Sequence, residues 1–388
     1  MTHIYGIDAA GQDALAKASH IAREVAAAHA ADVDQKGRFP SEAMAALAQA
    51  GLMGLTVPAE LGGMGQGMRA FAAVAEELAT ACASTAMIYV MHNAALQTIV
   101  ATKTLAGRDA LLRDIASGKH LTTLAFSEVG TRSNFWFQGS ELAPAGEGYT
   151  VTGHKSWVTS SLHAQSYVAL SRRPGAANAG DLTMYLVRNG QPGMAVRGGF
   201  DGLGLRGNES GPVLFDGYRI SEGDLISPHG AGNDVSLGVV LPWFNVGTSA
   251  MAHGLCRAAL SATTTHLVGA GFDFNGSKLR DLPNLRTRLA EMAVATEKSR
   301  ALLGYTFTVL ESASEAAPLY VLEVRYSAVN AATEVTDLAM KACGGAAFRK
   351  ELGVERAFRD ARAGWVMAPT SDALADFIGK ALTGLPLL

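Results

Sequence analysis

The sequence predicts an α+β protein in which a helical domain, a β domain and a four-helix bundle follow one another along the chain. Alanine-rich segments with apolar residues three and four positions apart dominate residues 1–118. Short segments rich in branched and aromatic residues, separated by glycine and proline, dominate residues 119–230. Long helical patterns return in residues 231–388. We therefore predict three domains with these bounds, the central one a β-barrel or a β-sandwich.

The helical patterns of the first domain are interrupted by one glycine-rich loop. They cover residues 13–31, 40–50, 69–81 and 84–105. The loop, GLMGLTVPAELGGMG at 51–65, holds too many glycines for a helix. The clearest strand patterns of the second domain are residues 149–153, 167–171 and 182–187. The long helices predicted for the third domain are residues 241–268, 284–312 and 318–343, with a glycine-containing linker at 269–281.

Composition and charge argue against a nucleic-acid-binding protein, a disulfide-rich protein and a membrane protein. The chain has 388 residues and a net charge of -3, so it has no basic surplus for binding nucleic acid. Its three cysteines lie far apart without a CxxC pair, which predicts no disulfide framework, no metal site and a reducing, cytoplasmic location. We find neither a signal peptide pattern nor an apolar run of the roughly 18 residues that span a bilayer. We therefore expect no membrane partner.

The last part of the chain predicts three helices joined by two turns. The first helix stops at Gly344 and Gly345, where a bare backbone is able to approach a ligand closely. The second covers residues 352–362, with charged and apolar residues at helical spacing. A short loop from Ala368 to Ser371 breaks this pattern before the third helix.

Several motifs in this order carry a resemblance to a known family. They are GLMGLTVPAELGGMG at 51–65, SEVGTRSN at 127–134, GHKSWVTSS at 153–161, GLGLRGNESGPVLFDGYRI at 202–220, HGLCRAAL at 253–260, and KACGGAAF with ERAFRDAR at 341–362. The chain resembles the acyl-CoA dehydrogenase superfamily over nearly its full length. This resemblance implies a flavin-dependent oxidoreductase, with FAD held between the β domain and the bundle. It also implies a homotetramer or homodimer in which neighbouring subunits share cofactor contacts.

The resemblance assigns cofactor contacts to two groups of residues. Ser127 and Ser133 match positions at the flavin and the substrate entrance, and Trp157 and Thr159 match the strand along the flavin ring. Strand packing and turn formation are the alternative role for these four residues. The second group is Lys341, Gly344 and Gly345, where lysine replaces the family's usual glutamine. Because an arginine that binds the diphosphate in relatives is also missing from residues 270–276, FMN stays open as an alternative to FAD.

Both positions of the family's catalytic base differ in this chain. The resemblance implies a glutamate where this sequence has Ala368, and alanine accepts no proton. Some relatives carry the base on the bundle helix instead, where this chain reads PWFN at 242–245. Since loss of a positioned base costs roughly 100- to 10,000-fold in rate, ordinary acyl-CoA dehydrogenation is disfavoured. Asp372, one helical turn beyond Ala368, is the candidate for a displaced base, with stabilisation of the helix start as its alternative role.

The tail is similar to that of one superfamily branch that lacks the glutamate, the flavin-dependent monooxygenases resembling dibenzothiophene monooxygenase. Such enzymes take reduced flavin from a separate flavin reductase and transfer one oxygen atom to a small hydrophobic substrate. This chemistry needs a dry pocket, and the residues we expect to line it are Phe126, Trp243, Phe244, Trp365 and Met367. His92 is the predicted hydrogen-bond donor in the pocket, and a structural histidine is the alternative.

Three functions therefore stay open. The first is a two-component flavin monooxygenase, which the missing bases favour. The second is a dehydrogenase that desaturates an acyl thioester, carried by coenzyme A or an acyl carrier, with a displaced base. The third is a subunit that binds flavin without catalysing a reaction.

Overall fold

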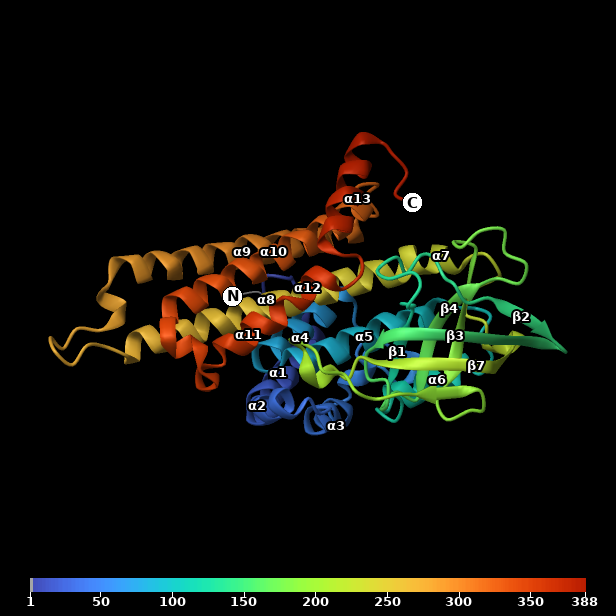
Figure 1. The fold of residues 1–388 in the computed structure, drawn as a ribbon, viewed down its shortest axis with the longest axis horizontal. Helices are drawn as coiled ribbons and strands as arrows, with labels where there is room; N and C mark the ends of the chain where they lie inside the picture. The colour runs from blue at the N-terminus through green and yellow to red at the C-terminus, as the bar shows by residue number, and fades with distance from the viewer. Residues whose placement is uncertain (1–2) are drawn as a thin grey trace.

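The N-terminal part is a layer of helices packed around one long buried helix. The computed structural model describes residues 3–388 (Figure 1). The helices are α1 (Ala9–Ile21), α2 (Ala27–Lys36), α3 (Ser41–Gln49), α4 (Met68–Ala81), α5 (Ala83–Ala101) and α6 (Arg108–Ala116). Helix α5 is buried on nearly all sides because it packs against both the bundle and the β domain. The glycine-rich segment 51–65 forms a loop with two short 3₁₀ turns, as predicted.

The central part consists of two β-sheets that share one core. Its strands are β1 (Thr122–Ala125), β2 (Leu142–Ala145), β3 (Gly148–Val158), β4 (Ser166–Arg172), β5 (Leu182–Arg188), β6 (Met194–Val196) and β7 (Gly211–Ser221). One sheet has the order β1-β4-β5, and the other, fully antiparallel, has the order β2-β3-β7-β6. Alternate residues of β4 face opposite sides: Tyr167 packs between the sheets, and Val168 packs towards the helices. The first sheet is therefore buried on both faces.

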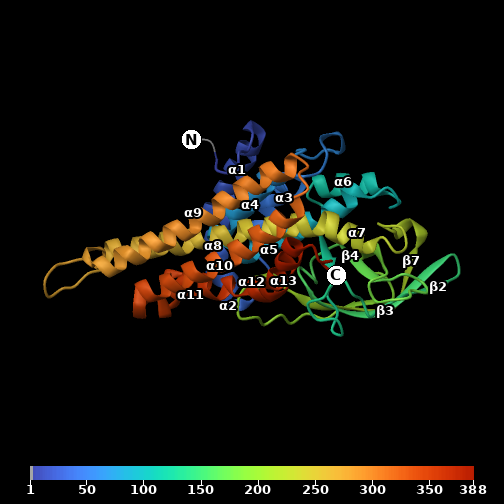
Figure 2. The ribbon, with the colours of Figure 1, turned by 90° about the horizontal axis from the view of Figure 1, so that it is seen from above.

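The C-terminal part is a bundle of long helices. The helices of this part, long and short, are α7 (Gly232–Val235), α8 (Leu241–Gly269), α9 (Pro283–Glu311), α10 (Ala317–Cys343), α11 (Val354–Ala361), α12 (Ala363–Val366) and α13 (Ser371–Thr383). Helix α8 packs against α4, α5, α9, α10 and α11, so it joins the bundle to the N-terminal layer. Two glycines allow this close approach: a Cβ on Gly247 or Gly254 would lie within 3.0 Å of atoms of α4. The predicted order of helical, β and helical parts is confirmed (Figure 2).

One helical stretch, residues 232–269, is long and apolar enough to cross a membrane by length and composition. The expectation that no segment reaches this level was wrong, because glycine, alanine and threonine add little polarity to this helix. In its most apolar window 61% of the residues are buried inside the protein. A buried core helix meets the same two criteria.

Candidate functional site

The end of β3 displays one aromatic ring on the surface. Trp157 lies where the pairing of β3 with β7 shifts register, between Lys155 and Val158. Its φ is 58°, in the left-handed region that residues other than glycine rarely adopt, and its side chain is 68% exposed. The indole packs edge-on against Phe200, with the ring centroids 6.2 Å apart. A strained backbone that presents a flat apolar ring to solvent is typical of a ligand-binding position.

Unpaired polar groups lie next to this tryptophan. The Ser160 hydroxyl and the side-chain oxygen of Asn208 are buried, and neither has a hydrogen-bond partner within residues 3–388. The Ser160 backbone N–H donates to the Asn208 carbonyl at 2.9 Å, so the two residues are adjacent. The Thr159 hydroxyl is buried 3.3 Å from that of Ser210. Buried polar atoms normally find partners, so these groups fit a ligand with hydrogen-bonding atoms beside a flat ring.

A buried ion pair holds this strand end in place. The Lys155 ammonium donates to Glu128 Oε1 at 2.7 Å and to Gln138 Oε1 at 2.8 Å, and both charged residues are buried. Burial lowers the pKa of Lys155, against the attraction of Glu128. Burial also opposes ionisation of Glu128, but Lys155 and the hydrogen bonds from Ser140 outweigh it, so the pKa of Glu128 is lowered. The attraction of Lys155 and the hydrogen bonds from Ser140 therefore favour the ionised form of Glu128.

The same pair brings the predicted serine turn to the tryptophan. The backbone N–H of Ser156 donates to the Ser127 carbonyl at 2.8 Å, so Ser127 lies beside the residue that precedes Trp157. Ser133 lies farther along the turn, is partly exposed, and has no hydrogen-bond partner for its hydroxyl in the described part of the chain. Ser127, Trp157 and Thr159 thus share one region, as the sequence predicts.

The second predicted group of cofactor residues lies elsewhere. Lys341 is exposed near the end of α10, and Gly344 and Gly345 follow at the tip of the bundle. A Cβ added to either glycine would meet open space, and both positions are exposed. Gly345 lines an open pocket of about 480 Å³. This tip is remote from the β domain in both views (Figures 1 and 2), so one chain alone does not bring the two groups together.

His92 does not have the free nitrogen that a donor role requires. It is fully buried on α5, with Nε2 3.0 Å from the Met53 carbonyl and Nδ1 accepting from the Thr122 backbone N–H at 3.2 Å. Burial lowers its pKa to about 4, so the ring is neutral at physiological pH. Both ring nitrogens therefore form hydrogen bonds with backbone groups. This geometry favours the structural alternative over the predicted donor.

The position of the missing glutamate, Ala368, and the candidate base Asp372 both lie at least partly exposed near the C-terminus. Ala368 is partly exposed in the segment between α12 and α13, and its methyl side chain offers no proton acceptor. Asp372 is exposed in the first turn of α13, after the N-cap Thr370, whose hydroxyl accepts from the Ala373 N–H. This is the position expected of an acid that stabilises a helix start.

Three of the predicted pocket residues belong to the main core. Phe126 and Phe244 are buried in the same apolar cluster, and Trp243 packs against it. The Trp243 ring lies 5.3 Å from that of Phe71 on α4. The PWFN segment therefore joins α8 to the N-terminal layer.

The other two pocket residues flank the turn after α12. Trp365 is 41% exposed, with the Arg362 guanidinium 5.2 Å from its ring centroid. The Met367 carbonyl accepts a hydrogen bond of 2.9 Å from Arg325. Since Arg325 also lies 4.6 Å from the Phe244 ring centroid, this arginine brings Met367 and Phe244 together.

Arg325 is the functional candidate that the sequence analysis missed. It is on α10 and its side chain is fully buried. The signal was present in the sequence, because Arg325 follows Val321 by four residues and precedes Ala328 by three, within the apolar stripe of a long helix. A charged residue in such a stripe needs an explanation.

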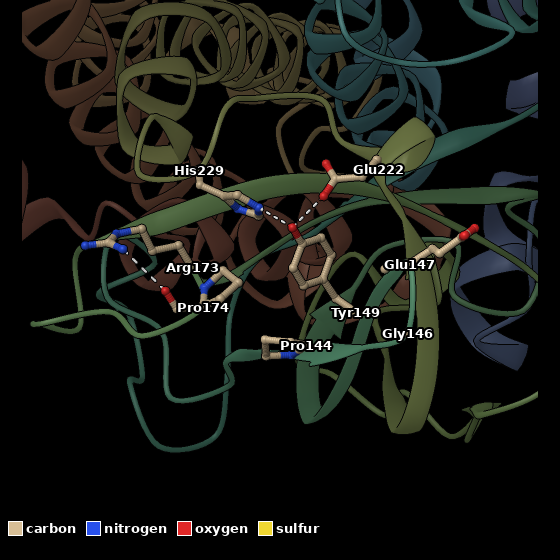
Figure 3. Close-up of a pocket in the computed structure, with 9 residues that line it drawn as sticks. Pro144, Gly146, Glu147, Tyr149, Arg173, Pro174, Glu222 and His229 are labelled. Atoms are coloured by element: carbon tan, nitrogen blue, oxygen red, sulfur yellow. Dashed lines mark hydrogen bonds between the residues drawn. The ribbon is translucent and has the colours of Figure 1, made fainter.

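Figure 3 shows a separate open pocket of about 470 Å³ on the outer surface of the β domain. The Tyr149 hydroxyl lies between His229 and Glu222, donating to Glu222 Oε1 at 2.5 Å and lying 2.9 Å from His229 Nε2. Tyr149 and Trp157 are eight residues apart on β3, which is about 26 Å along a strand. This pocket is therefore distinct from the region around Trp157.

Comparison with known proteins identifies the family. The chain matches the family models "Acyl-CoA dehydrogenase, N-terminal domain" over residues 10–119, "Acyl-CoA dehydrogenase, middle domain" over 123–218, and "Acyl-CoA dehydrogenase, C-terminal domain" over 230–383. The chain belongs to the acyl-CoA dehydrogenase superfamily. The resemblance and the fold class predicted from the sequence are thereby confirmed.

Relatives and solved structures of the superfamily cover most of the chain. The short-chain specific acyl-CoA dehydrogenase of Bos taurus is 28% identical over 344 residues, which is 88% of this chain and 82% of the relative. The structure of butyryl-CoA dehydrogenase from Megasphaera elsdenii superposes with a TM-score of 0.91 at 20% identity, over 97% of this chain and 99% of the other. The FAD complex of PigA superposes with a TM-score of 0.89 at 18% identity, over 97% and 98%. Members of the superfamily are flavin-dependent oxidoreductases and bind FAD, which agrees with the enzyme class and the cofactor predicted from the sequence.

The RDAR segment of this superfamily member contains a buried acid with a distinct pH response. Asp360 accepts a hydrogen bond of 2.6 Å from the Leu205 backbone N–H, which ties α11 to the turn before β7. Burial raises the pKa of Asp360 to about 6. An unfolded aspartate has a pKa of about 3.9. Asp360 is therefore protonated in the folded chain, and ionised in the unfolded chain, between about pH 4 and pH 6.

We predict that Asp360 makes the protein less stable as pH rises through this window. The folded state binds the extra proton, so the free energy of unfolding that depends on Asp360 falls by about 2 kcal/mol between pH 4 and pH 7. Asp360→Asn keeps the acceptor for Leu205 and has no titrating proton. In urea unfolding across this range, wild type should lose stability relative to Asp360→Asn as pH rises. A constant difference between them would contradict the prediction.

Proposed function

We propose that this chain is an FAD-dependent oxidoreductase that oxidises acyl thioesters. The observation that carries the proposal is the exposed Trp157 on a left-handed turn, next to the unpaired polar atoms of Ser160 and Asn208. It lies in the β domain of a chain that all three acyl-CoA dehydrogenase domain models match. The acyl thioester class follows from relatives named as acyl-CoA dehydrogenases.

The residues around Trp157 fit one part of FAD. The indole offers a face to the flavin ring, and Ser127, Thr159 and Ser160 offer hydroxyl groups to its polar edge. When bound, FAD supplies the two-electron acceptor of the reaction. Preorganised hydroxyl and amide groups stabilise negative charge on a bound ligand without having to reorient.

The bundle tip fits the other part of FAD, but in a different copy of the chain. Gly344 and Gly345 leave the backbone open to a phosphate, and Lys341 offers a positive charge. Since this tip is remote from the β domain in one chain, we propose a homotetramer or homodimer in which the tip of one subunit completes the site of another. FMN, which lacks the adenylate half, would need only the Trp157 region. Chromatographic identification of the flavin released from the purified protein separates the two cofactors.

The experiment that tests the function is an anaerobic titration of the FAD-loaded protein with butyryl-CoA and longer acyl-CoA thioesters. We expect loss of oxidised-flavin absorbance as thioester is added, and an enoyl thioester as product by mass spectrometry. Failure of every acyl-CoA to bind would overturn the proposal. Because Ala368 provides no proton acceptor, we expect the reduction to be slow compared with enzymes that have a positioned base.

Asp372 is the acid that the dehydrogenase function would need in place of a glutamate at position 368. Its exposure on α13 leads us to expect that Asp372→Asn leaves the rate of flavin reduction unchanged. Asp376→Asn is the matched control, because Asp376 is an exposed acid on the same helix. A loss of about 100-fold or more in Asp372→Asn alone would identify Asp372 as the displaced base.

One observation favours a second candidate, a monooxygenase that receives reduced flavin from a separate reductase. Neither position where the resemblance implies a base holds a carboxylate, because residue 368 is alanine and residues 242–245 are Pro-Trp-Phe-Asn. An oxygenase does not need one. Reaction of the reduced protein with ¹⁸O₂ and a hydrophobic substrate, followed by mass spectrometry, distinguishes the candidates. If neither this reaction nor acyl-CoA oxidation occurs, a non-catalytic flavin-binding subunit remains.

A further inference from the structure

Arg325 is a buried positive charge without a negative partner. Its side chain is fully buried within the bundle, and within residues 3–388 no carboxylate oxygen lies within the 4.0 Å limit of an ion pair. Lys155, which is also a buried cation, has such a partner in Glu128. Buried charges in proteins are normally paired, so Arg325 departs from the rule that Lys155 follows.

All of the groups that contact Arg325 are neutral. Nη2 donates to the Met367 carbonyl at 2.9 Å, and Nη1 has only two long contacts, 3.4 Å to Thr248 Oγ1 and 3.5 Å to Asn245 Oδ1. Nε has no partner in the described part of the chain. Burial lowers the pKa of Arg325 to about 9, and no acid among the described residues opposes the effect. The guanidinium is still charged at neutral pH, and its donors are incompletely used.

Arg325 contacts two of the residues that the sequence analysis predicts to line the substrate pocket. It lies between α8 and the turn that carries Met367 and Ala368, with the Phe244 ring against one face. Phe244 and Met367 were predicted from the sequence to line the substrate pocket. Met367 and Ala368 are partly exposed, so a ligand that displaces the Met367 side chain has a short route to the guanidinium.

We propose that Arg325 binds a carboxylate on the acyl chain of the substrate, so that the preferred substrates are thioesters of dicarboxylic acids. This inference rests on the proposed acyl thioester function. A carboxylate supplies the missing negative charge and accepts two hydrogen bonds from one edge of a guanidinium. A substrate with a plain alkyl chain would leave the charge uncompensated. Arg325 is thus a specificity-determining residue.

The test compares two thioesters that differ only at the end of a five-carbon chain. Glutaryl-CoA ends in a carboxylate and pentanoyl-CoA ends in a methyl group. We expect isothermal titration of the anaerobic FAD-loaded oligomer to give about 10- to 100-fold tighter binding of glutaryl-CoA. In Arg325→Met the preference should disappear or reverse, and in Arg325→Lys it should be partly retained.

Stability separates this role from a structural one. Replacing an uncompensated buried charge by an apolar side chain of similar size is often neutral or stabilising, so ligand-free Arg325→Met should be at least as stable as wild type. If Arg325→Met does not fold, the binding comparison of Arg325→Lys and Arg325→Gln with wild type decides. Equal wild-type binding of the two thioesters, or a preference that survives in Arg325→Gln, would overturn the inference. If the inference about Arg325 is overturned in this way while pentanoyl-CoA still binds, the proposed acyl thioester function stands. If neither thioester binds, both the inference and the proposed function are overturned.

Discussion

Ala368→Glu is expected to raise the rate of flavin reduction by butyryl-CoA about 100- to 10,000-fold, the range that a positioned general base contributes. The substitution restores the acid that the resemblance to acyl-CoA dehydrogenases implies at this position. Ala368 is partly exposed, so the longer side chain does not have to fit inside the core. The Arg325 guanidinium, which already binds the adjacent Met367 carbonyl at 2.9 Å, would favour the ionised form of the new carboxylate.

The matched control for this gain is Ala368→Gln. Glutamine has nearly the same size and hydrogen-bonding reach but takes up no proton at neutral pH. We expect it to react as slowly as wild type. Rapid-mixing measurements under anaerobic conditions, on proteins of equal FAD content, provide the comparison. If Ala368→Glu and Ala368→Gln react at the same rate, position 368 is not where the α-proton leaves, and the monooxygenase becomes the better candidate.

Lys155→Met is expected to destabilise the protein by about 3 to 5 kcal/mol, the usual effect of removing one partner of a buried ion pair. Glu128 would keep its hydrogen bonds from Ser140 and from the Gly139 backbone N–H, at 2.6 Å, but would lose the ammonium at 2.7 Å. A buried carboxylate without a positive partner costs far more than the lost contact itself. The expected result in urea unfolding is a lower midpoint.

The control is the double variant Lys155→Met/Glu128→Gln. Glutamine removes the stranded charge, so the double variant should recover much of the stability lost in Lys155→Met. A double variant as unstable as the sum of both single changes would show that the two residues act independently. Because this pair holds Ser127 and Trp157, we also expect Lys155→Met to bind FAD more weakly than the double variant at equal folded fraction.

The structure brings the first predicted group of cofactor residues together within one chain but leaves the second group apart from it. Ser127 and Trp157 are 30 positions apart in the chain, yet a bond of 2.8 Å from Ser156 to Ser127 makes them neighbours. Lys341 and Gly344 lie at the end of α10, on the bundle tip that is remote from the β domain. Their role as cofactor contacts depends on a second subunit, and mixed oligomers of Gly344→Trp and Trp157→Ala subunits offer a direct way to examine it.

The sequence by itself determined the order of helical, β and helical parts, the superfamily, and the strand that carries Trp157. The spacing of apolar residues along a chain indicates which side of a helix or strand is buried, and motifs indicate the protein family. Neither indicates which atoms of other elements contact the buried side. Only the tertiary structure showed that both nitrogens of His92 bind backbone groups, that Lys155 has a buried acidic partner, and that Arg325 has no such partner within residues 3–388. These properties depend on distances between side chains far apart in the chain, and on the exclusion of water around them, which only the packed fold defines.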